Sequence, residues 1–443
     1  MKTKLILCPL VKVFRRGQIV CLFHPYSLER VYIDNATFRT LQKSAEKLDA
    51  EMVSDLLERG ILVDSTFKKT EFIESFASKY LYNKPQITIC YLMHTTFCNF
   101  ACKYCYVATH KLPIQLMDMK VAKWGIDVFL KHTELVHEDD PRKLIHFGGE
   151  PLINFPVLKA ITLYAKEQFY RQGIELETVV VTNASLINEK MADFFHRNDV
   201  WVNVSIDGPQ DIHDKMRIGL NGRGTFKETK RGLDLLKKYN CNILITCTVG
   251  VHNIENLPQI IEYFFNELNV EGVKLNPVSG FLSQGELQEV PPHLLFKKML
   301  EAFKVARDLG LYEDTFMKPI KAFVEQRFNI RGCGAVGNQI VVWPNGNVTP
   351  CHAIQQSPNY VSIATKTIDL TRDPIFLEWN RRVPLMFHEC QKCKAIGICG
   401  GGCPYRAFIK NNTIWSIDER WCLLSRKLLE WLIWDLYGAI SKK

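Results

Sequence analysis

Three cysteines stand close together in the first quarter of the chain, at Cys98, Cys102 and Cys105, with three and then two residues between them. Three thiolates can occupy three corners of a cubic iron–sulfur cluster, whereas the usual protein set is four cysteines. One iron would then lack a protein ligand and be open to chemistry. A closed zinc site is the alternative, because zinc takes four ligands and His94 or His110 could supply the fourth.

A glycine-rich turn, Gly148-Gly149-Glu150-Pro151, is the second candidate motif. The two glycines permit a sharp turn and a close approach of the backbone to a ligand. The carboxylate of Glu150 can accept hydrogen bonds from an ammonium group. The tetrapeptide is a weak signal alone and a stronger one because it follows the cysteine triplet by one predicted βα unit.

Short polar side chains follow later strands of the chain, at Asn183, Ser205 and Asp207. They suit the hydroxyl groups of a ribose. Arg217 carries a forked guanidinium that can bind a carboxylate through two hydrogen bonds. Other roles are open for each residue, since Asn183 could cap a helix, Asp207 could stabilise a turn and Arg217 could be a surface charge.

Seven more cysteines lie beyond residue 332. They are Cys333, Cys351, Cys390, Cys393, Cys399, Cys403 and Cys422. Seven sulfurs exceed one tetrahedral zinc site, so two metal sites fit better. His352 follows Cys351 directly, and its imidazole, with an ordinary pKa of about 6.5, is a candidate base. It could equally be a ligand or a packing residue.

The elements that must position these residues alternate from Gln86 onward between strands and longer amphipathic segments, which predicts βα units around a parallel sheet. The predicted strands are 87–93, 144–147, 178–182, 201–206, 243–249 and 272–276. Six such strands make a partial (β/α)6 barrel of the α/β class. Ligands of α/β barrels lie at the C-terminal ends of the strands, and the triplet begins just after the first strand.

The rest of the chain divides into further predicted units. Residues 1–66 form a separate domain with strands at 11–14, 19–24, 30–33 and 61–63 and helices at 36–48 and 50–59. A helical linker over 67–85 leads into the barrel at 86–290, and a loop at 279–292 lies where the barrel pattern ends. Bridging helices at 294–306 and 316–328 fall within 291–332. Residues 333–443 are expected to be organised by metal rather than by an apolar core, and to end in a helix at 423–440.

Composition limits the function classes. The net charge of +9 over 443 residues is dispersed, which argues against nucleic acid and suits an acidic peptide equally well. No apolar stretch is long enough to span a membrane, and the N-terminus lacks the pattern of a signal peptide. Fifteen cysteines in such a chain indicate metal sites in a reducing, cytoplasmic setting.

The triplet, with Tyr104 before its last cysteine, resembles the signature of the radical S-adenosylmethionine (SAM) enzymes. The resemblance implies a 4Fe–4S cluster whose open iron binds SAM, and a SAM pocket that includes Tyr104 and the Gly148–Pro151 turn. It also implies that Asn183, Ser205, Asp207 and Arg217 contact SAM. Phe147 stands where sulfatase maturases, which belong to this family, carry a glutamine.

The later cysteines resemble those of the SPASM domain, which holds two auxiliary 4Fe–4S clusters in radical SAM peptide maturases. The resemblance assigns the distal cluster to Cys390, Cys393, Cys399 and Cys422, and the proximal cluster to Cys333, Cys351 and Cys403. Sulfatase maturases have a further cysteine where this chain has Gln339, and a proton-abstracting aspartate where it has His352. The fourth ligand of the proximal cluster is therefore left open.

The N-terminal domain is similar in architecture to the winged-helix elements that bind the leader of a precursor peptide. A small structural cap is the alternative. Together these resemblances imply an enzyme that modifies a ribosomally made peptide, most simply by an oxidative carbon–carbon or carbon–heteroatom crosslink, with a flavodoxin- or ferredoxin-type protein as the electron donor. The alternatives are a formylglycine-forming sulfatase maturase, a peptide splicing or epimerising enzyme, and an electron-transfer scaffold without catalytic activity.

Overall fold

The computed structural model describes residues 4–81, 84–105, 113–133, 141–279, 289–354 and 368–441. A nine-stranded sheet lies at its centre, in the order β12-β11-β10-β9-β8-β7-β6-β13-β14. All neighbours from β12 to β13 are parallel, and the β13–β14 pair is antiparallel. The strands are β6 (Ile89–Met93), β7 (Arg142–Phe147), β8 (Leu176–Thr182), β9 (Val200–Ser205), β10 (Ile243–Val249), β11 (Gly272–Pro277), β12 (Tyr312–Glu313), β13 (Gln339–Val342) and β14 (Val348–Thr349). The predicted α/β class and the six predicted barrel strands are confirmed.

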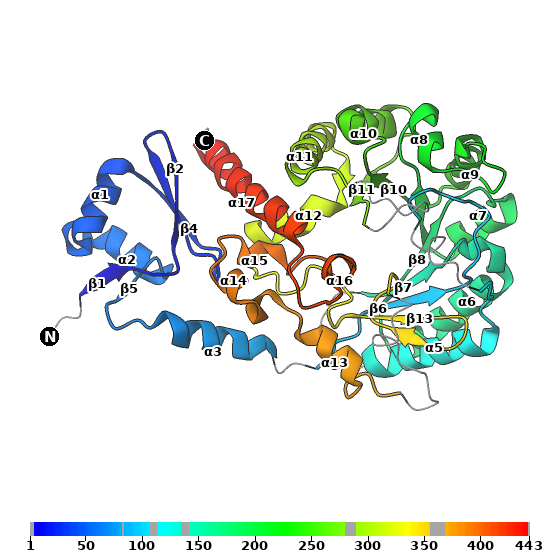
Figure 1. Cartoon of the computed structure of the whole chain (residues 1–443), viewed down its shortest axis with the longest axis horizontal. Coiled ribbons are helices and arrows are strands. Elements are labelled where there is room, and N and C mark those ends of the chain that lie inside the picture. Colours follow the sequence, from blue (N-terminus) through cyan, green and yellow to red (C-terminus); the bar gives the residue numbers. More distant parts are fainter. Residues whose placement is uncertain are drawn as a thin grey trace.

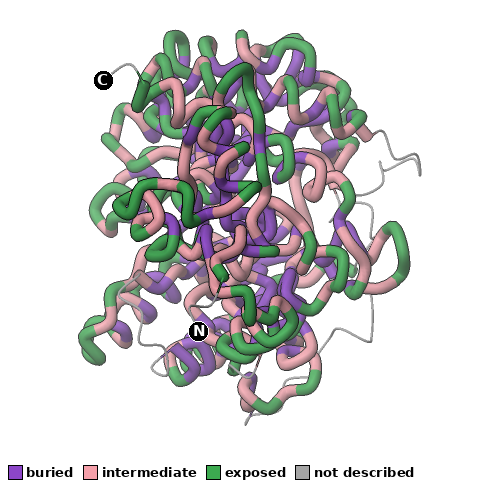
Figure 2. Tube along the Cα trace, turned by 90° about the vertical axis from the view of Figure 1, so that its left-hand side faces the viewer, coloured by how far each residue is buried: buried purple, intermediate pink, exposed green. Residues whose placement is uncertain are grey.

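Helices cover the convex face of this sheet, which is the right-hand part of the molecule in Figure 1. They are α5 (Met119–Thr133), α6 (Phe155–Arg171), α7 (Glu189–Arg197), α8 (Gln210–Met216), α9 (Phe226–Lys238), α10 (Leu257–Asn266), α11 (Pro292–Leu309) and α12 (Asp314–Val324). Alternation along the strands explains the layering, because Val200, Val202 and Val204 of β9 are all buried in the main core. Figure 2 shows that buried parts of the chain gather in the middle of the molecule.

The sheet continues past the predicted boundary at residue 333. Strand β13 pairs with β6 in parallel, with Gln339 opposite Ile89 and Val342 opposite Leu92. Its residues Ile340 and Val342 belong to the apolar core beneath α5 and α6. The last predicted domain therefore contributes strands to the barrel sheet, which the sequence reasoning did not anticipate.

The N-terminal unit has two small sheets. Strands β2 (Lys12–Arg16), β3 (Ile19–Phe23) and β4 (Arg30–Asp34) form an antiparallel sheet, and β1 (Leu5–Leu7) pairs with β5 (Leu62–Asp64). Helices α1 (Asn35–Lys43) and α2 (Ala50–Glu58) pack beside them, and α3 (Lys69–Leu81) leads to the barrel. The side chain of Asp34 caps α1, as its position before the helix predicts.

The C-terminal segment is helical and has an apolar core of its own. Its helices are α13 (Pro374–Arg381), α14 (His388–Gln391), α15 (Ile396–Cys399), α16 (Pro404–Asn411) and α17 (Glu419–Ile440). Trp379, Ile414 and Ile354 are buried together with Cys351, so the expectation that metal replaces a core here is wrong. In Figure 1 α17 lies between the N-terminal unit and the barrel helices, and Tyr32 of β4 donates to Ile433 O at 2.6 Å.

Candidate functional site

The cysteine triplet lies in the loop after β6 and is hydrogen-bonded to the C-terminal end of α8 and the residues that follow it. The two backbone hydrogen bonds run from Ala101 N to Ile218 O (2.7 Å) and from Lys103 N to Met216 O (2.9 Å). Burial is the largest cause that raises the pKa of Cys98. The negative charges of the Glu150 carboxylate and of the other two thiols of the triplet raise it further. The thiolate form of Cys98 is therefore disfavoured, and thiols held this way gain from a metal that takes their negative charge.

The glycine turn lies directly against this loop. A side chain on Gly149 would place its Cβ 2.1 Å from Phe97 O, and one on Gly148, whose φ is +139°, would lie 2.5 Å from Thr95 O. Backbone bonds fix the contact, because Gly149 N donates to Thr95 O (2.8 Å). Both glycines are thus required for the turn to reach the residues that lead into Cys98.

Glu150 is a buried carboxylate with room for one more donor. Its Oε1 accepts from Leu152 N (3.1 Å) and from the hydroxyl of Thr182 (2.7 Å), and its Oε2 accepts from Asn183 N (2.9 Å). A carboxylate has about four acceptor positions, so one on Oε2 remains. Burial raises the pKa of Glu150 to about 7, which a cation at this position would reverse. The group fits an ammonium, as the sequence predicts.

Asp207 is the centre of a charged cluster. Its Oδ2 accepts a hydrogen bond from the hydroxyl of Tyr104 (2.5 Å) and lies 3.3 Å from Nε2 of His252. Its Oδ1 lies 3.0 Å from Nε of Arg217 and accepts a hydrogen bond from Thr248 N (3.0 Å). Burial would raise the pKa of Asp207, but Arg217 and then His252 hold it well below its usual value. The carboxylate is thus occupied by protein donors and holds Tyr104 and Arg217 in place.

Arg217 keeps part of its guanidinium free. Nη2 donates to the hydroxyl of Thr248 (3.2 Å) and Nε faces Asp207, while Nη1 has no hydrogen-bond partner among the described residues. The guanidinium also lies 5.4 Å from the centre of the Tyr104 ring. A buried arginine with free N–H groups beside a buried glutamate site suits the two charged ends of an amino acid.

The side chains of Asn183 and Ser205 differ in their hydrogen bonds. The side-chain amide of Asn183 donates to Asn99 Oδ1 (3.0 Å) and to the sulfur of Cys98 (3.8 Å), and its oxygen accepts from Ser185. Ser205 ends β9, and its hydroxyl makes no hydrogen bond within the described part of the chain. Asn183 thus faces the triplet, while Ser205 is available to a ligand.

The later cysteines form two sets. Burial is the largest cause that raises the pKa of Cys422, and the thiols of Cys399, Cys390 and Cys393 add to it. Burial likewise raises the pKa of Cys351, and here the neighbouring thiols are those of Cys333 and Cys403. These neighbouring thiols fall in the same groups that the resemblance to the SPASM domain implies, while iron ligation itself stays a prediction.

Arg382 lies between the two sets and was missed by the sequence reasoning. It is fully buried and donates to three carbonyl oxygens, those of Ile414, Gly401 (3.0 Å) and Ser416 (3.0 Å). Burial lowers its pKa, and thiols of both sets, together with Asp418, oppose this shift. Arginines are mostly exposed, so nothing in the sequence distinguishes this one from its neighbour Arg381.

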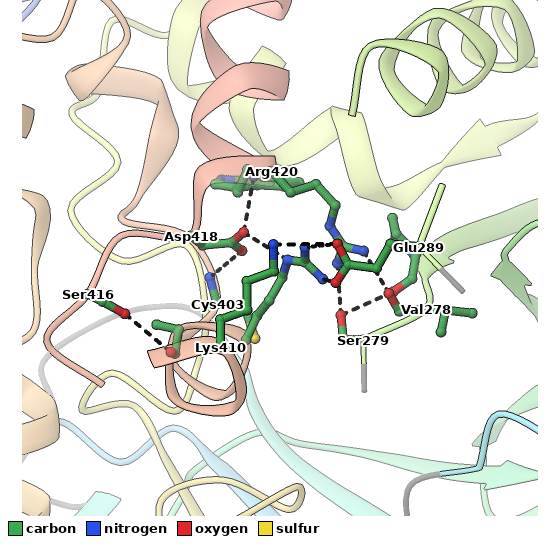
Figure 3. Close-up of polar contacts among 12 residues, drawn as sticks. Val278, Ser279, Glu289, Cys403, Lys410, Ser416, Asp418 and Arg420 are labelled. Carbon is green, nitrogen blue, oxygen red and sulfur yellow. Dashed lines mark hydrogen bonds and ion pairs between the residues drawn. The ribbon is translucent and has the colours of Figure 1, made fainter. Parts of the chain in front are cut away.

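Charged groups also fix Cys403. Figure 3 shows Asp418 beside Cys403, whose N–H donates to it (3.1 Å), and Arg420 reaching Val278 O (2.6 Å) and Ser279 (2.8 Å). Arg406, which follows Cys403 by three positions, pairs with Asp418 and donates to both carboxylate oxygens of Glu289 at 2.6 Å. The predicted loop at 279–292 lies largely outside the described residues, but its two ends are thereby attached to the C-terminal segment.

His352 lies inside the barrel between two aromatic rings. The ring centres of Tyr91 on β6 and Phe147 on β7 are 5.2 and 5.1 Å from its own. Burial, followed by the charge of Lys274, lowers the pKa of His352 to about 4. The imidazole is therefore neutral at neutral pH, and it packs against Phe147, the residue directly before the glycine turn.

The zinc alternative for the triplet has little geometric support. His94 is buried, and its Nε2 is shared with Nδ1 of His146 at 2.8 Å, while His110 lies outside the described residues. Among the residues that the structure describes, no three His, Cys, Asp or Glu side chains converge on one ion position. Thiols that raise one another's pKa without meeting at one ion position suit an iron–sulfur cluster, because several irons then lie between the sulfurs.

Comparison with known proteins identifies the family. The model of the radical SAM superfamily matches residues 92–264. An uncharacterized protein of Methanocaldococcus jannaschii, MJ0907, is 34% identical over 219 residues, which are 49% of this chain and 70% of that protein. The chain belongs to the radical SAM superfamily. The expected cofactors, SAM and iron–sulfur clusters, are those of this superfamily.

Two longer matches extend over most of this radical SAM protein. The radical SAM cyclopropyl synthase TigE of Paramaledivibacter caminithermalis is 23% identical over 426 residues, 90% of this chain and 84% of TigE. The solved structure of native anSMEcpe with bound AdoMet and Cp18Cys peptide covers 81% of this chain and 100% of that chain, with a TM-score of 0.67 and 18% identity. This likeness shows a shared fold. No described helix of this radical SAM protein is both long and apolar enough to cross a lipid bilayer.

Proposed function

We propose that this radical SAM protein modifies a ribosomally made peptide, and that an oxidative crosslink is the outcome. The observation that carries the proposal is the joining of three sites in one sheet. The triplet loop and the glycine turn lie at the ends of β6 and β7, and β13 attaches the proximal cysteines to the same strands. A substrate bound between them would face all three sites.

In this proposal Cys98, Cys102 and Cys105 hold the SAM-binding cluster, while Glu150 and Arg217 bind the amino and carboxylate groups of SAM. When bound, these cofactors supply a 5′-deoxyadenosyl radical for hydrogen abstraction. The residues of the chain itself orient and shield these cofactors. Asp207 holds Arg217, and the Gly148–Pro151 turn and Ser205 line the pocket.

The two later sets of cysteines would hold the auxiliary clusters, which would supply an electron acceptor for the peptide. His352 would take the proton that the peptide loses, because its ring packs against Phe147, directly before the glycine turn, and it directly follows Cys351 in the chain. Gln339, in the position of the missing cysteine, donates to Pro350 O at 2.6 Å beside this set. In this proposal the three proximal cysteines would leave one ligand position of their cluster to the substrate.

The N-terminal unit would bind the leader of the peptide. A groove of about 510 Å³ runs along β2 and is lined by Lys12, Phe14, Arg15, Lys394 and Trp434 among others. Strand β2 is an edge of its sheet, so a peptide strand can pair with it through main-chain hydrogen bonds. The basic residues favour an acidic leader.

The test is anaerobic incubation of reconstituted protein with SAM, dithionite and the short peptide encoded beside its gene. We expect 5′-deoxyadenosine and a peptide that has lost two hydrogens. An altered stereocentre with unchanged mass would show epimerisation, and formylglycine at Ser or Cys would show a sulfatase-type maturase. If no 5′-deoxyadenosine forms, or if the variant with alanine at the three triplet cysteines forms it equally well, the enzymatic proposal is wrong and a scaffold role stands.

A further inference from the structure

A basic groove lies on the outer surface of the barrel, along α9. Its volume is about 490 Å³, and its lining includes Lys227, Lys230, Arg231 and Lys238 with Phe226 at one end. Helix α9 carries five lysine and arginine residues against two acidic ones, a net charge of +3. The groove is far from the leader groove of the N-terminal unit, since α9 lies at the right of the molecule in Figure 1 and β2 lies at the left.

Part of this charge is uncompensated. Lys230 pairs with Asp234 (2.6 Å) and Lys238 with Glu189 (3.0 Å), but Lys227 has no carboxylate partner among the described residues. Arg231 donates to a carbonyl oxygen, which leaves its charge in place. A surface with standing positive charge attracts an acidic partner and speeds its association.

The floor of the groove connects directly to the cysteine triplet. Nη2 of Arg231 donates to Ser185 O at 2.6 Å, and the hydroxyl of Ser185 donates to Asn183 Oδ1 at 2.6 Å. The amide of Asn183 then donates to the sulfur of Cys98. One residue, Ser185, thus separates the surface arginine from the hydrogen-bond partner of the triplet.

The helix is pressed onto this connection. A Cβ on Gly232 would lie 1.9 Å from Ala184 O, so only glycine allows α9 to approach the turn so closely. Ala184 itself has a φ of +61°, a conformation that alanine seldom adopts. Close packing here shortens the path from the groove to Cys98. This matters because the rate of electron transfer falls steeply with distance.

We propose that the α9 groove is the docking surface for an acidic one-electron donor protein that carries a low-potential flavin or iron–sulfur centre. The inference rests on the proposed function, because a radical SAM reaction needs one electron for each SAM cleaved. The donor centre is oxidised by one electron, the metal centre at the triplet is reduced by one, and no bond forms between the two proteins. The route runs past Arg231, Ser185 and Asn183.

The experiment uses the reconstituted full chain and, as the probe, a bacterial flavodoxin reduced by NADPH and its reductase. The variant is Lys227→Glu/Lys230→Glu, and the matched control is Lys297→Glu on α11, also an exposed lysine. Flavodoxin binding is measured without SAM by calorimetry at about 0.05 M and about 0.5 M salt. The rate of 5′-deoxyadenosine formation is measured separately with flavodoxin and with dithionite.

We expect the double variant to raise the flavodoxin Kd by about tenfold at low salt, with a smaller effect at high salt because screening weakens surface charge. Its flavodoxin-supported rate should fall while its dithionite-supported rate stays that of the parent. The control should bind and react as the parent does. Equal Kd values for parent and double variant, or equal losses in the control, would overturn the proposal.

Two further outcomes separate this inference from the function on which it rests. If dithionite yields no 5′-deoxyadenosine, the proposed function fails, and the binding measurement still tests the groove. If an RNA of arbitrary sequence binds with a sensitivity to Lys227→Glu/Lys230→Glu and flavodoxin does not bind, the groove is a nucleic-acid surface and the docking proposal is wrong.

Discussion

The side-chain amide of Asn183 donates a hydrogen bond to the sulfur of Cys98 across 3.8 Å. Hydrogen bonds to ligand sulfurs stabilise the more negative, reduced state of a cluster and so raise its potential. The same residue, through its backbone N–H, binds Glu150. Asn183 therefore links the electronic properties of the triplet to the SAM pocket.

Replacing this amide should shift the potential of the cluster. For Asn183→Ala we expect a decrease of about 60 mV, which corresponds to about 1.4 kcal/mol for a one-electron couple. A redox titration followed by electron paramagnetic resonance measures it. Ser185→Ala is the control, because it removes a neighbour of the amide and leaves the donor to Cys98. An unchanged potential in Asn183→Ala would show that the contact has no electronic effect.

SAM binding should depend on pH through Glu150. Burial raises the pKa of this carboxyl to about 7, and the ammonium of SAM prefers the ionised form. Below pH 7 the carboxyl must release a proton before it pairs, so affinity should rise with pH and be about tenfold weaker at pH 6 than at pH 8. Calorimetry on reconstituted protein measures this. Glu150→Gln should bind weakly with no such slope, and a slope that persists in it would assign the effect elsewhere.

The buried Arg382 should matter for stability more than any surface charge nearby. Arg382→Met would leave three carbonyl oxygens without their donor and would leave the two thiol sets without a shared cation. We expect a loss of about 3–5 kcal/mol in the free energy of unfolding. Denaturant unfolding of the protein without clusters measures it. Arg381→Met, at an exposed neighbour, should cost little, and similar losses in both variants would refute the assignment.

Iron content should fall stepwise as the cysteine sets are removed. Cys390→Ala/Cys393→Ala should lower the iron bound after reconstitution by about four atoms per chain, and the triplet variant by about four more. Cys241→Ala is the control, because its sulfur donates to Ala192 O and lies outside all three sets. Iron and sulfide assays with visible absorption provide the measurement. A loss of iron in the control equal to that in the double variant would contradict the assignment.

The sequence predicts the barrel strands well because each combines a β-branched run with a following turn, as Val200–Ser205 does. It failed at β13 and β14, which are short and lie in a segment rich in glycine and cysteine. A signal was present, since Asn345-Gly346 between apolar residues is typical of a hairpin turn. Strand β1 was also missed, because three residues that pair only with β5 leave little pattern.

The candidate site was predictable as a set of residues and not as a network. The resemblance to the SPASM domain, rather than spacing alone, divided the later cysteines into two groups, and the Gly148–Pro151 turn follows β7 at the edge of the sheet where ligands of α/β barrels lie. The partners of each side chain were not predictable. Asp207 was expected to meet a ribose and instead holds Arg217 and Tyr104. Such choices depend on which chain segments meet in space, and the sequence of one segment does not contain that information.

The pairing of β13 with β6 limits how this protein can be rearranged. A chain cut before residue 333 would leave the hydrogen-bonding edge of β6 open, and an open apolar edge invites aggregation. The cysteine-rich segment therefore cannot be exchanged as an independent unit. A chimera with a relative would fold only if it included the strand Gln339–Val342 and kept Gln339 opposite Ile89.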